Sequence, residues 1–219
     1  MARSDSARPA ADQAHRPLNR ELILDGAIAL IERDGRESLS MRRLGSALGV
    51  EGMAIYHHFQ GRDELLAAIG DRLLEPLREL DLGDDWREAC RRFATTLRDI
   101  AVARPATFQL LGLQPLDTPA ALEPVERLLG VLVGFGFSAP EALATYRATV
   151  SYARGYALAE ATGFTVDAAR PDGRERLADL PRSEFPILAG KARELAELDA
   201  DAAFKLGLDA LLFGLGGPA

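Results

Sequence analysis

The chain has 219 residues, of which 47% are hydrophobic and 27% charged, and its net charge of −7 by itself argues against a nucleic-acid partner. This length suits one large domain or two small ones. The sequence contains no apolar run of about 18 residues, which argues against a membrane span. Its first twenty residues contain no apolar segment, which argues against a secretory signal. Because Cys90 is the single cysteine, an internal disulfide and a multi-cysteine zinc site are excluded, and we expect a cytoplasmic protein. We expect the Cys90 thiol to be buried and inert.

An arm and a first helix are predicted at the start of the chain. Residues 1–17 are rich in Ala, Arg, Asp and Pro without periodicity, which is typical of a flexible arm. Asn19 is a favourable N-cap, and apolar residues then recur at the spacing of one helix face until Gly35. We therefore expect the first helix between Asn19 and Gly35.

Two short helices and a tight turn are predicted next. Ser40 can cap a helix that ends at Gly49, where the chain needs a left-handed turn residue. A third helix is expected over residues 52–58, and a fourth over residues 62–80. Short helices joined by a glycine-containing turn are typical of a helix-turn-helix unit.

Helices are also predicted for the rest of the chain, and we find no convincing strand, repeat or cluster of metal ligands. Capping residues, prolines and glycines set the helix boundaries. The expected helices cover residues 86–103, 106–111, 122–133, 138–162, 186–198 and 200–215. Residues 163–184 contain glycines, prolines and alternating charges, which are typical of a mobile loop. The predicted fold class is all-α.

The negative charge is not spread evenly along the chain. Residues 1–62 contain nine arginines and eight acidic residues, a balance of +1. Residues 63–219 contain 17 basic and 25 acidic residues, a balance of −8, and the two parts sum to −7. Nucleic acid is therefore expected to contact only the amino-terminal part.

The third predicted helix has an exposed face that suits a DNA groove. Leu44, Leu48, Val50 and Ile55 are expected to fix the angle between the second and third helices. The exposed face then carries Met53, Tyr56, His57 and His58. Such groups can contact thymine methyls, base edges and phosphates in a major groove. The alternatives are a packing role for Tyr56 and an ordinary surface position for the two histidines.

The segment from Arg20 to Leu66 resembles the tetracycline-repressor (TetR) family of bacterial transcription regulators. The Leu-Gly-Val turn, the aromatic residues Tyr56 and Phe59, and the sequence Gly-Arg-Asp-Glu-Leu-Leu at the fourth helix carry the resemblance. It implies phosphate contacts at Ser40 and Tyr56 and a guanine contact at Arg42. It further implies base reading at Gly52, Met53 and His57 and backbone anchors at His58 and Arg62. Arg43 is expected to be a solvated residue or a phosphate contact.

The carboxyl-terminal part resembles the regulatory domain of the same family. The resemblance is carried by Gly-Phe-Ser at 136–138, Tyr-Ala-Leu-Ala-Glu at 156–160 and the final helix. It implies a homodimer in which two helices of each copy form a four-helix interface. The expected interface residues form two apolar stripes at helical spacing: Tyr146, Val150, Ala153, Ala157, Phe204, Leu208, Leu211, Leu212 and Leu215. One stripe can instead face the internal core.

The effector site is where the sequence departs from the tetracycline repressor. Positions that would offer polar or magnesium-binding groups are apolar here, so neither tetracycline, nor a metal ion, nor another cofactor is expected. We expect instead a cavity for a largely apolar molecule, lined by Phe93, Leu97, Phe108, Leu110, Leu113, Leu128, Leu129 and the partner's Ala159. Arg78 is expected to pair with an acidic group of the effector. The alternative is that these residues fill a solid core.

Together these features predict an all-α regulator with three parts. Residues 1–17 form an arm, residues 18–64 a three-helix DNA-binding domain with a helix-turn-helix, and residues 65–219 a larger ligand-binding and dimerisation domain. The predicted function is that of a homodimeric repressor that binds a palindromic operator in double-stranded DNA and is released by a small apolar effector. The alternatives are a constitutive DNA-binding regulator and, with less support, a helical enzyme, because no catalytic pair or phosphate loop is found.

Overall fold

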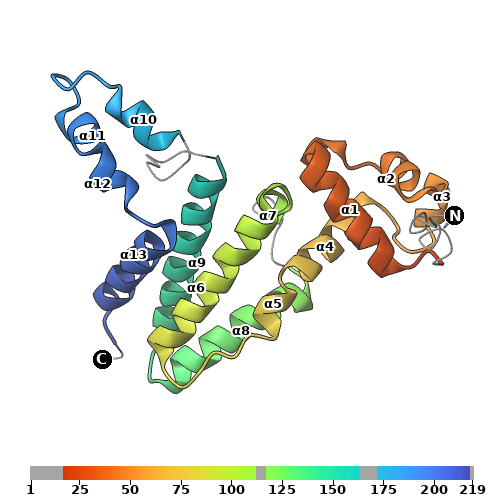
Figure 1. Cartoon of the computed structure of the whole chain (residues 1–219). Coiled ribbons are helices and arrows are strands. Elements are labelled where there is room, and N and C mark those ends of the chain that lie inside the picture. Colours follow the sequence, from red (N-terminus) through yellow and green to blue (C-terminus); the bar gives the residue numbers. More distant parts are fainter. Residues whose placement is uncertain (1–16, 112–116, 163–171, 218–219) are drawn as a thin grey trace, which may run out of the picture. The chain divides into compact units, whose positions relative to one another are not determined.

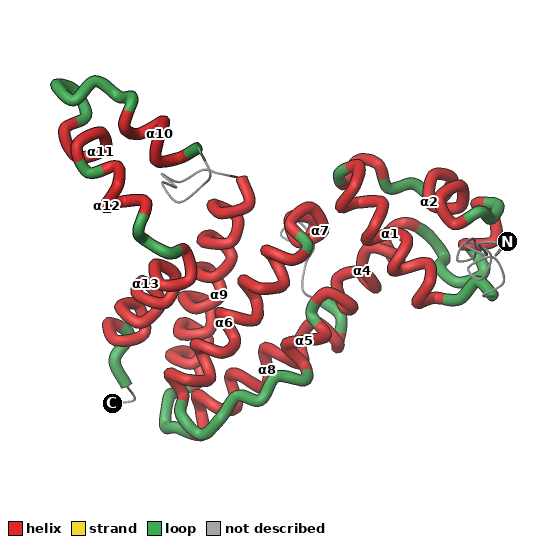
Figure 2. The backbone as a smooth tube through the Cα atoms, in the orientation of Figure 1, coloured by secondary structure: helices red, strands yellow, loops and turns green. Residues whose placement is uncertain are grey.

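The computed structural model describes residues 17–111, 117–162 and 172–217 and divides the chain into two compact units. The division falls between Ile69 and Gly70, five residues after the predicted boundary. Below, the head denotes residues 17–69 and the body residues 70–217. In the described part of the chain every regular element is a helix (Figure 2), as expected for the predicted all-α class. The predicted arm lies almost wholly outside the described residues.

The head consists of short helices whose ends follow local sequence signals. They are α1 (Arg20–Asp34), the 3-10 helix η1 (Arg36–Ser38), α2 (Met41–Leu48), α3 (Gly52–Ile55) and α4 (Arg62–Leu73), which continues into the body. The Asn19 side chain accepts a hydrogen bond from the Leu22 amide at 2.8 Å, which satisfies one of the free N–H groups at the start of α1. Gly35 ends α1 with φ of 79°.

A small apolar core holds the helices of the head together. Its fully buried side chains come from the four α-helices of the head and from the segment after α3: Ile23, Ile31, Leu44, Ile55, Phe59, Leu65 and Ile69. Each such side chain contributes about 1.5–3 kcal/mol through its removal from water. The core therefore fixes α2 and α3 while leaving their other faces exposed.

The body is a bundle of longer helices joined by shorter ones (Figure 1). They are α5 (Glu75–Arg78), α6 (Trp86–Ala103), α7 (Pro105–Leu111), α8 (Pro119–Gly134), α9 (Ala139–Thr162), α10 (Gly173–Ala178), α11 (Pro186–Gly190), α12 (Ala192–Ala196) and α13 (Ala200–Gly214). Helices α6 and α9 share the most extensive packing, and α8 and α13 both contact this pair. The core between them includes Trp86, Phe93, Leu128 and Phe204.

Two expected boundaries in the region of α3 to α5 differ from the structure. The helix expected over residues 62–80 is two helices, because Pro76 has no N–H to continue the ladder and α5 starts anew at Glu75. The third helix ends at Ile55, and residues 56–58 form a turn in which the His58 amide bonds to the Ile55 carbonyl at 2.9 Å.

The segment before α13 also differs from the expectation. Part of the loop expected over 163–184 is the helix α10, whose Arg176 pairs with Asp172 at 3.4 Å across one turn. Residues 163–171 lie outside the described residues. The helix expected over 186–198 is divided into α11 and α12 at Lys191, directly after Gly190, a poor helix former.

Candidate DNA-binding surface and apolar cavity

The turn between α2 and α3 depends on two glycines. Gly49 adopts the left-handed conformation with φ of 70°, which L side chains rarely adopt. At Gly45 a Cβ atom would lie only 2.9 Å from the backbone of Gly52, so α2 and α3 approach closely at this point. A Cβ at Gly52 would in turn point at the α2 backbone, 3.4 Å from the Arg42 Cα. The structure thus gives Gly52 a packing role, and its predicted role in base reading stays a prediction.

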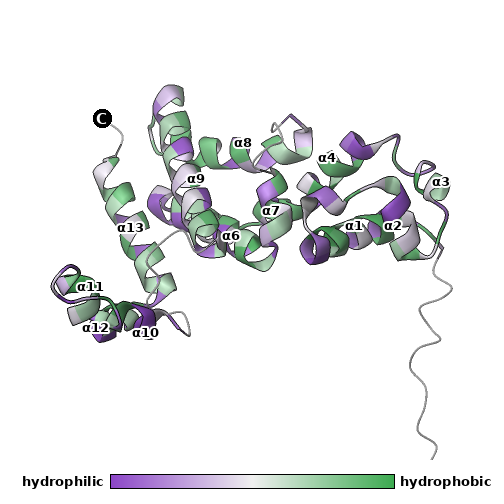
Figure 3. Cartoon of the chain, turned by 90° about the horizontal axis from the view of Figure 1, so that it is seen from above, coloured by the Kyte–Doolittle hydropathy of each residue, from purple (hydrophilic) through white to green (hydrophobic). Residues whose placement is uncertain are grey.

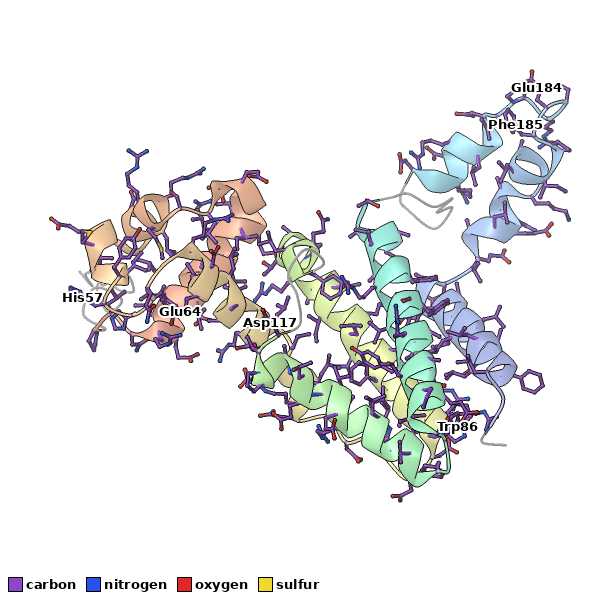
Figure 4. All side chains as sticks on the ribbon, turned by 180° about the vertical axis from the view of Figure 1, so that it is seen from behind. His57, Glu64, Trp86, Asp117, Glu184 and Phe185 are labelled. Carbon is purple, nitrogen blue, oxygen red and sulfur yellow. The ribbon has the colours of Figure 1, made fainter. Side chains whose placement is uncertain are left out.

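The residues predicted to contact DNA form an exposed surface around α3. Met53 is 70% exposed and Tyr56 47% exposed, although Ile55 between them is fully buried. His57 is exposed at the edge of the head, and His58 is partly buried (Figure 4). On α2, Arg42 is exposed, and its guanidinium makes no hydrogen bond or ion pair within the described residues. These large exposed groups are the kind that a groove of DNA would cover.

The other predicted contacts are held in place by neighbouring groups. The Ser40 hydroxyl accepts a hydrogen bond from the Arg43 amide at 3.2 Å and so caps α2. The Arg43 guanidinium pairs with Asp34 at 2.9 Å, while Arg33 pairs with the same carboxylate and is the main cause of its lowered pKa. Arg62 donates to the Leu39 carbonyl at 3.4 Å. Ser40, Arg43 and Arg62 therefore have structural contacts beside their predicted DNA roles.

Arg20 is a positioning residue that the sequence did not reveal. Its guanidinium donates to the His58 carbonyl and to Glu64 Oε1, the latter at 3.0 Å, and stacks over the Phe59 ring at 4.0 Å. Glu64 also accepts a hydrogen bond from the Gln60 amide at 2.7 Å, and this bond and then Arg20 lower the pKa of its carboxyl. Figure 4 labels Glu64 within this group of helices. These contacts tie the start of α1 to the segment that follows α3.

The body contains an apolar cavity between α5, α6, α7, α8 and α9. Its volume is about 50 Å³ and it is partly open to solvent, so it is smaller than the sites of about 300–1,000 Å³ that hold drug-sized molecules. Three predicted residues line it: Phe93, Leu97 and Phe108. The sequence did not point to the others: Leu74, Leu77, Ala121, Pro124, Val125, Tyr146, Val150 and Arg154, of which Tyr146 and Val150 were assigned to the dimer interface.

The remaining predicted cavity residues lie elsewhere. Leu110 and Leu128 are buried, and Leu128 belongs to the solid part of the core, with Leu129 partly buried against it. Arg78 and Ala159 do not line the cavity, and Leu113 lies outside the described residues. The charged residue of the lining is Arg154 and not the predicted Arg78.

Hydrogen bonds hold helix α8 at two points, to Asp71 near the end of α4 and to the carbonyls around the end of α5. The Thr118 hydroxyl caps α8 by accepting from the Ala121 amide at 3.1 Å and donates to Asp71 at 2.5 Å. Nine residues later, the Arg127 guanidinium donates to the carbonyls of Leu77, Arg78 and Leu80 around the end of α5. A cation at this position also matches the negative end of a helix.

The predicted dimer stripes face the interior of the chain. Ala153, Ala157, Phe204, Leu208 and Leu212 are at most 1% exposed, while Leu211 and Leu215 are partly buried against the same core. The five fully buried side chains cannot contact a partner, whereas Tyr146, Val150, Leu211 and Leu215 are only partly buried, so an interface role for these four stays a prediction. The opposite face of α13 carries Leu206 and Phe213, which are 71% and 83% exposed. Figure 3 shows that α13 is largely hydrophobic.

Two other groups of the body are buried. Burial raises the pKa of the Cys90 thiol to about 11, so the thiol stays protonated and unreactive at neutral pH. The Arg98 guanidinium joins three helices through two hydrogen bonds of 2.7 Å to Glu160 and one of 2.7 Å to Asp201.

In the described ranges no three acidic, His or Cys side chains gather to hold a metal ion, and no described helix is long and apolar enough to cross a membrane.

The two units match two parts of one protein family. Residues 23–69 match the bacterial regulatory proteins of the tetR family, and residues 80–217 match the tetracyclin repressor-like C-terminal domain. An HTH-type transcriptional regulator of Saccharopolyspora erythraea is 30% identical over 188 residues, covering 84% of this chain and 79% of the relative. The HTH-type transcriptional repressor DrrR1 of Streptomyces coeruleorubidus is 27% identical over 214 residues, 90% of this chain and 77% of the relative.

A solved structure agrees with these relatives along most of the chain. The crystal structure of the TetR family protein ActR of Streptomyces coelicolor in complex with (S)-DNPA has a TM-score of 0.68 at 26% identity. The match covers 92% of this chain and 98% of ActR. The matched families and relatives are transcriptional regulators, not enzymes. With its helix-turn-helix head and its matching body, this chain belongs to the TetR family of DNA-binding transcriptional regulators.

Proposed function

We propose that this regulator is a homodimeric repressor, acting in the cytoplasm, that releases a palindromic operator when a small, largely apolar molecule enters the cavity of the body. The observation that carries the proposal is the position of the cavity directly after α4. Leu74 and Leu77 line it, and they follow the last residue of α4 by one and four positions. The structure of ActR with (S)-DNPA supports it, because that relative binds a small molecule.

The contacts of α8 supply a route for the response. Ala121, Pro124 and Val125 of α8 line the cavity, and Thr118 and Arg127 of the same helix hold Asp71 and the carbonyls of α5. A ligand that displaces α8 therefore pulls on both ends of the segment 71–80. A conformer with altered head spacing would bind the operator less well. A tenfold to hundredfold release needs only about 1.4–2.8 kcal/mol of coupling between the two sites.

The exposed surface of the head is proposed to enter the major groove. Met53, Tyr56 and His57 around α3 would contact bases and phosphates, with Arg42 reaching a base edge from α2. Ser40, Arg43, His58 and Arg62 would contact the phosphate backbone at the rim. Because the body carries the acidic excess, it is repelled by DNA, and this leaves the head as the docking surface.

The proposed dimer uses the exposed faces of α9 and α13. Leu206, Ala210 and Phe213 lie on the outer face of α13, opposite the buried stripe. On α9 the outer face includes Gly155 and the 47% exposed Leu158. Small residues allow helices to approach closely, and large exposed apolar side chains mark surfaces that bind a partner. Two heads in one dimer would read two half-sites, separated by one or more turns of DNA.

Gel retardation with the DNA upstream of the chain's own coding sequence tests the proposal. We expect purified protein to bind this DNA and thermal-shift screening of small apolar molecules to identify ligands that stabilise the body. A cavity ligand should lower operator affinity at least tenfold. If every tight-binding ligand leaves the affinity unchanged, the chain is a constitutive DNA-binding regulator.

A further inference from the structure

The cavity lining carries two polar side chains on one face of α9. Tyr146, Val150 and Arg154 follow one another at intervals of four residues, so they lie above one another along the helix. They place a phenol, an aliphatic group and a guanidinium along the same wall. The facing wall is apolar and includes the rings of Phe93 and Phe108. The lining thus has one polar strip and otherwise offers only apolar contact.

Arg154 differs from the paired arginines of the body. Arg91 bonds to Asp209, Arg92 to Glu88 and Arg98 to Glu160. Arg154 is partly buried, yet among the described residues its guanidinium has neither a hydrogen-bond acceptor nor an ion-pair partner. A charge beside an apolar wall loses part of its hydration free energy, and pairing with a bound anion would compensate for that loss.

Tyr146 is placed to assist the same group. Its hydroxyl makes no hydrogen bond with a described residue, and its ring contacts Phe93 edge-on with a centroid distance of 6.1 Å. Burial raises the pKa of the Tyr146 phenol, and the Arg154 charge partly opposes that rise. The phenol therefore stays protonated at neutral pH and remains a hydrogen-bond donor toward an anion.

We propose that the effector of this regulator is an aromatic carboxylic acid whose carboxylate pairs with Arg154 and whose ring fills the apolar part of the cavity. A guanidinium offers two parallel N–H donors that match the two oxygens of a carboxylate, which favours an acid over a neutral analogue of equal shape. This inference rests on the proposed effector role of the cavity and names the chemical class that the cavity selects.

Calorimetric titration of the full-length protein with a matched pair of probes tests this inference. The pair is benzoate and benzamide, which have the same single ring and differ in charge. We expect the carboxylate to bind at least tenfold more tightly than the amide. Arg154→Met should remove this preference by weakening the acid alone, and Arg154→Lys should keep a smaller preference because ammonium is a point charge.

Arg147→Met is the control, because Arg147 is exposed on the same helix and does not line the cavity. This variant should keep the full preference for the acid. Equal binding of acid and amide, no binding of the acid, or a preference that survives Arg154→Met would each overturn the inference. Gel retardation separates it from the proposed function: an acid that binds through Arg154 and leaves the operator complex intact contradicts the regulatory role only.

Discussion

The head and the body use charged side chains in different ways. In the head, Arg42 is exposed and has no partner among the described residues, and the Arg43–Asp34 pair has an arginine side chain that is 50% exposed. In the body, the Arg98 side chain is 8% exposed and bonds to two carboxylates from two other helices. The head therefore presents its charges to solvent and to DNA, whereas the body uses its most buried charge to hold α6, α9 and α13 together.

The partners proposed for the two units account for this difference. DNA is a polyanion whose phosphates and base edges need exposed donors, so a reading surface gains from arginines without internal partners. A cavity for an apolar molecule needs walls without charge, and Arg154 is the exception that we assign to the effector. The contrast predicts that substitutions in the two units have separate consequences.

The largest expected effect concerns the outer face of α13. The double substitution Leu206→Glu and Phe213→Glu places two charges on each copy where an apolar interface is proposed, and a single central interface residue can contribute 2 kcal/mol or more. We expect sedimentation velocity to show a monomer at micromolar concentration, with operator binding strongly weakened. The control is Val102→Glu, because Val102 is 54% exposed on another helix. A dimer that survives the double substitution rules out this interface.

The next effect compares a buried with an exposed ion pair. Arg98→Met leaves Glu160 and Asp201 without their partner in a partly buried site, and we expect a loss of about 3 kcal/mol in the free energy of unfolding. Arg43→Met breaks the exposed pair with Asp34 and should cost less than about 1 kcal/mol. Urea unfolding followed by circular dichroism measures both. Similar losses would contradict the contrast between the two units.

Much of the head could be predicted from the sequence because its signals are local. Asn19 and Ser40 cap their helices, and Gly49 adopts the left-handed turn that its position suggested. The contacts of Arg20 could not be predicted, because they join residues 38 and 44 positions apart. No periodicity links such residues, and only the folded core brings them together.

The body was harder to predict because several faces of a helix are apolar. The stripe of Phe204, Leu208 and Leu212 was recognised, but its spacing does not say whether it faces its own core or a partner. Tyr146 and Val150 line the cavity for the same reason, since helix periodicity gives a face and not the neighbour of that face. The α4–α5 break was missed because Pro76 lies within an otherwise continuous helical pattern.

The exposed surface of the head should determine DNA affinity. Arg42→Ala and Tyr56→Ala each remove a proposed contact, and we expect each to weaken operator binding by about 1–3 kcal/mol without lowering thermal stability. The control is Arg33→Ala, which removes an equal charge from a residue paired with Asp34 at the end of α1. Gel retardation at fixed salt concentration measures all three. Wild-type affinity in both contact variants would place the reading surface elsewhere.

A smaller effect is expected at the contacts through which we propose that the body transmits the effector signal. Arg127→Met removes the hydrogen bonds to the α5 carbonyls and leaves the cavity lining intact. We expect unchanged effector affinity and a coupling free energy reduced by about 0.5–2 kcal/mol, so that the bound effector releases less DNA. Glu126→Gln, at the exposed neighbouring position, should leave release unchanged. Full release by the Arg127→Met variant would show that α8 does not carry the response.

The smallest expected effect is a pH dependence of the head. The pKa of the Glu64 carboxyl is lowered in the folded state, first by the Gln60 amide and then by Arg20. A carboxyl with a lowered pKa stabilises the fold above its unfolded pKa of about 4.3, and the contribution disappears as the pH falls through the folded value. The protection factors of the amides of residues 58–60, in which the intrinsic slowing of exchange by acid is corrected for, should therefore fall below about pH 4.3. Glu64→Gln should exchange faster already at pH 7 and lose this acid dependence, because the amide side chain has no charge to titrate.

If acid instead loosens α9 and α13 before the head, the Arg98 pairs and not Glu64 govern the response to pH, since the pKa of Asp201 is also lowered by its partner.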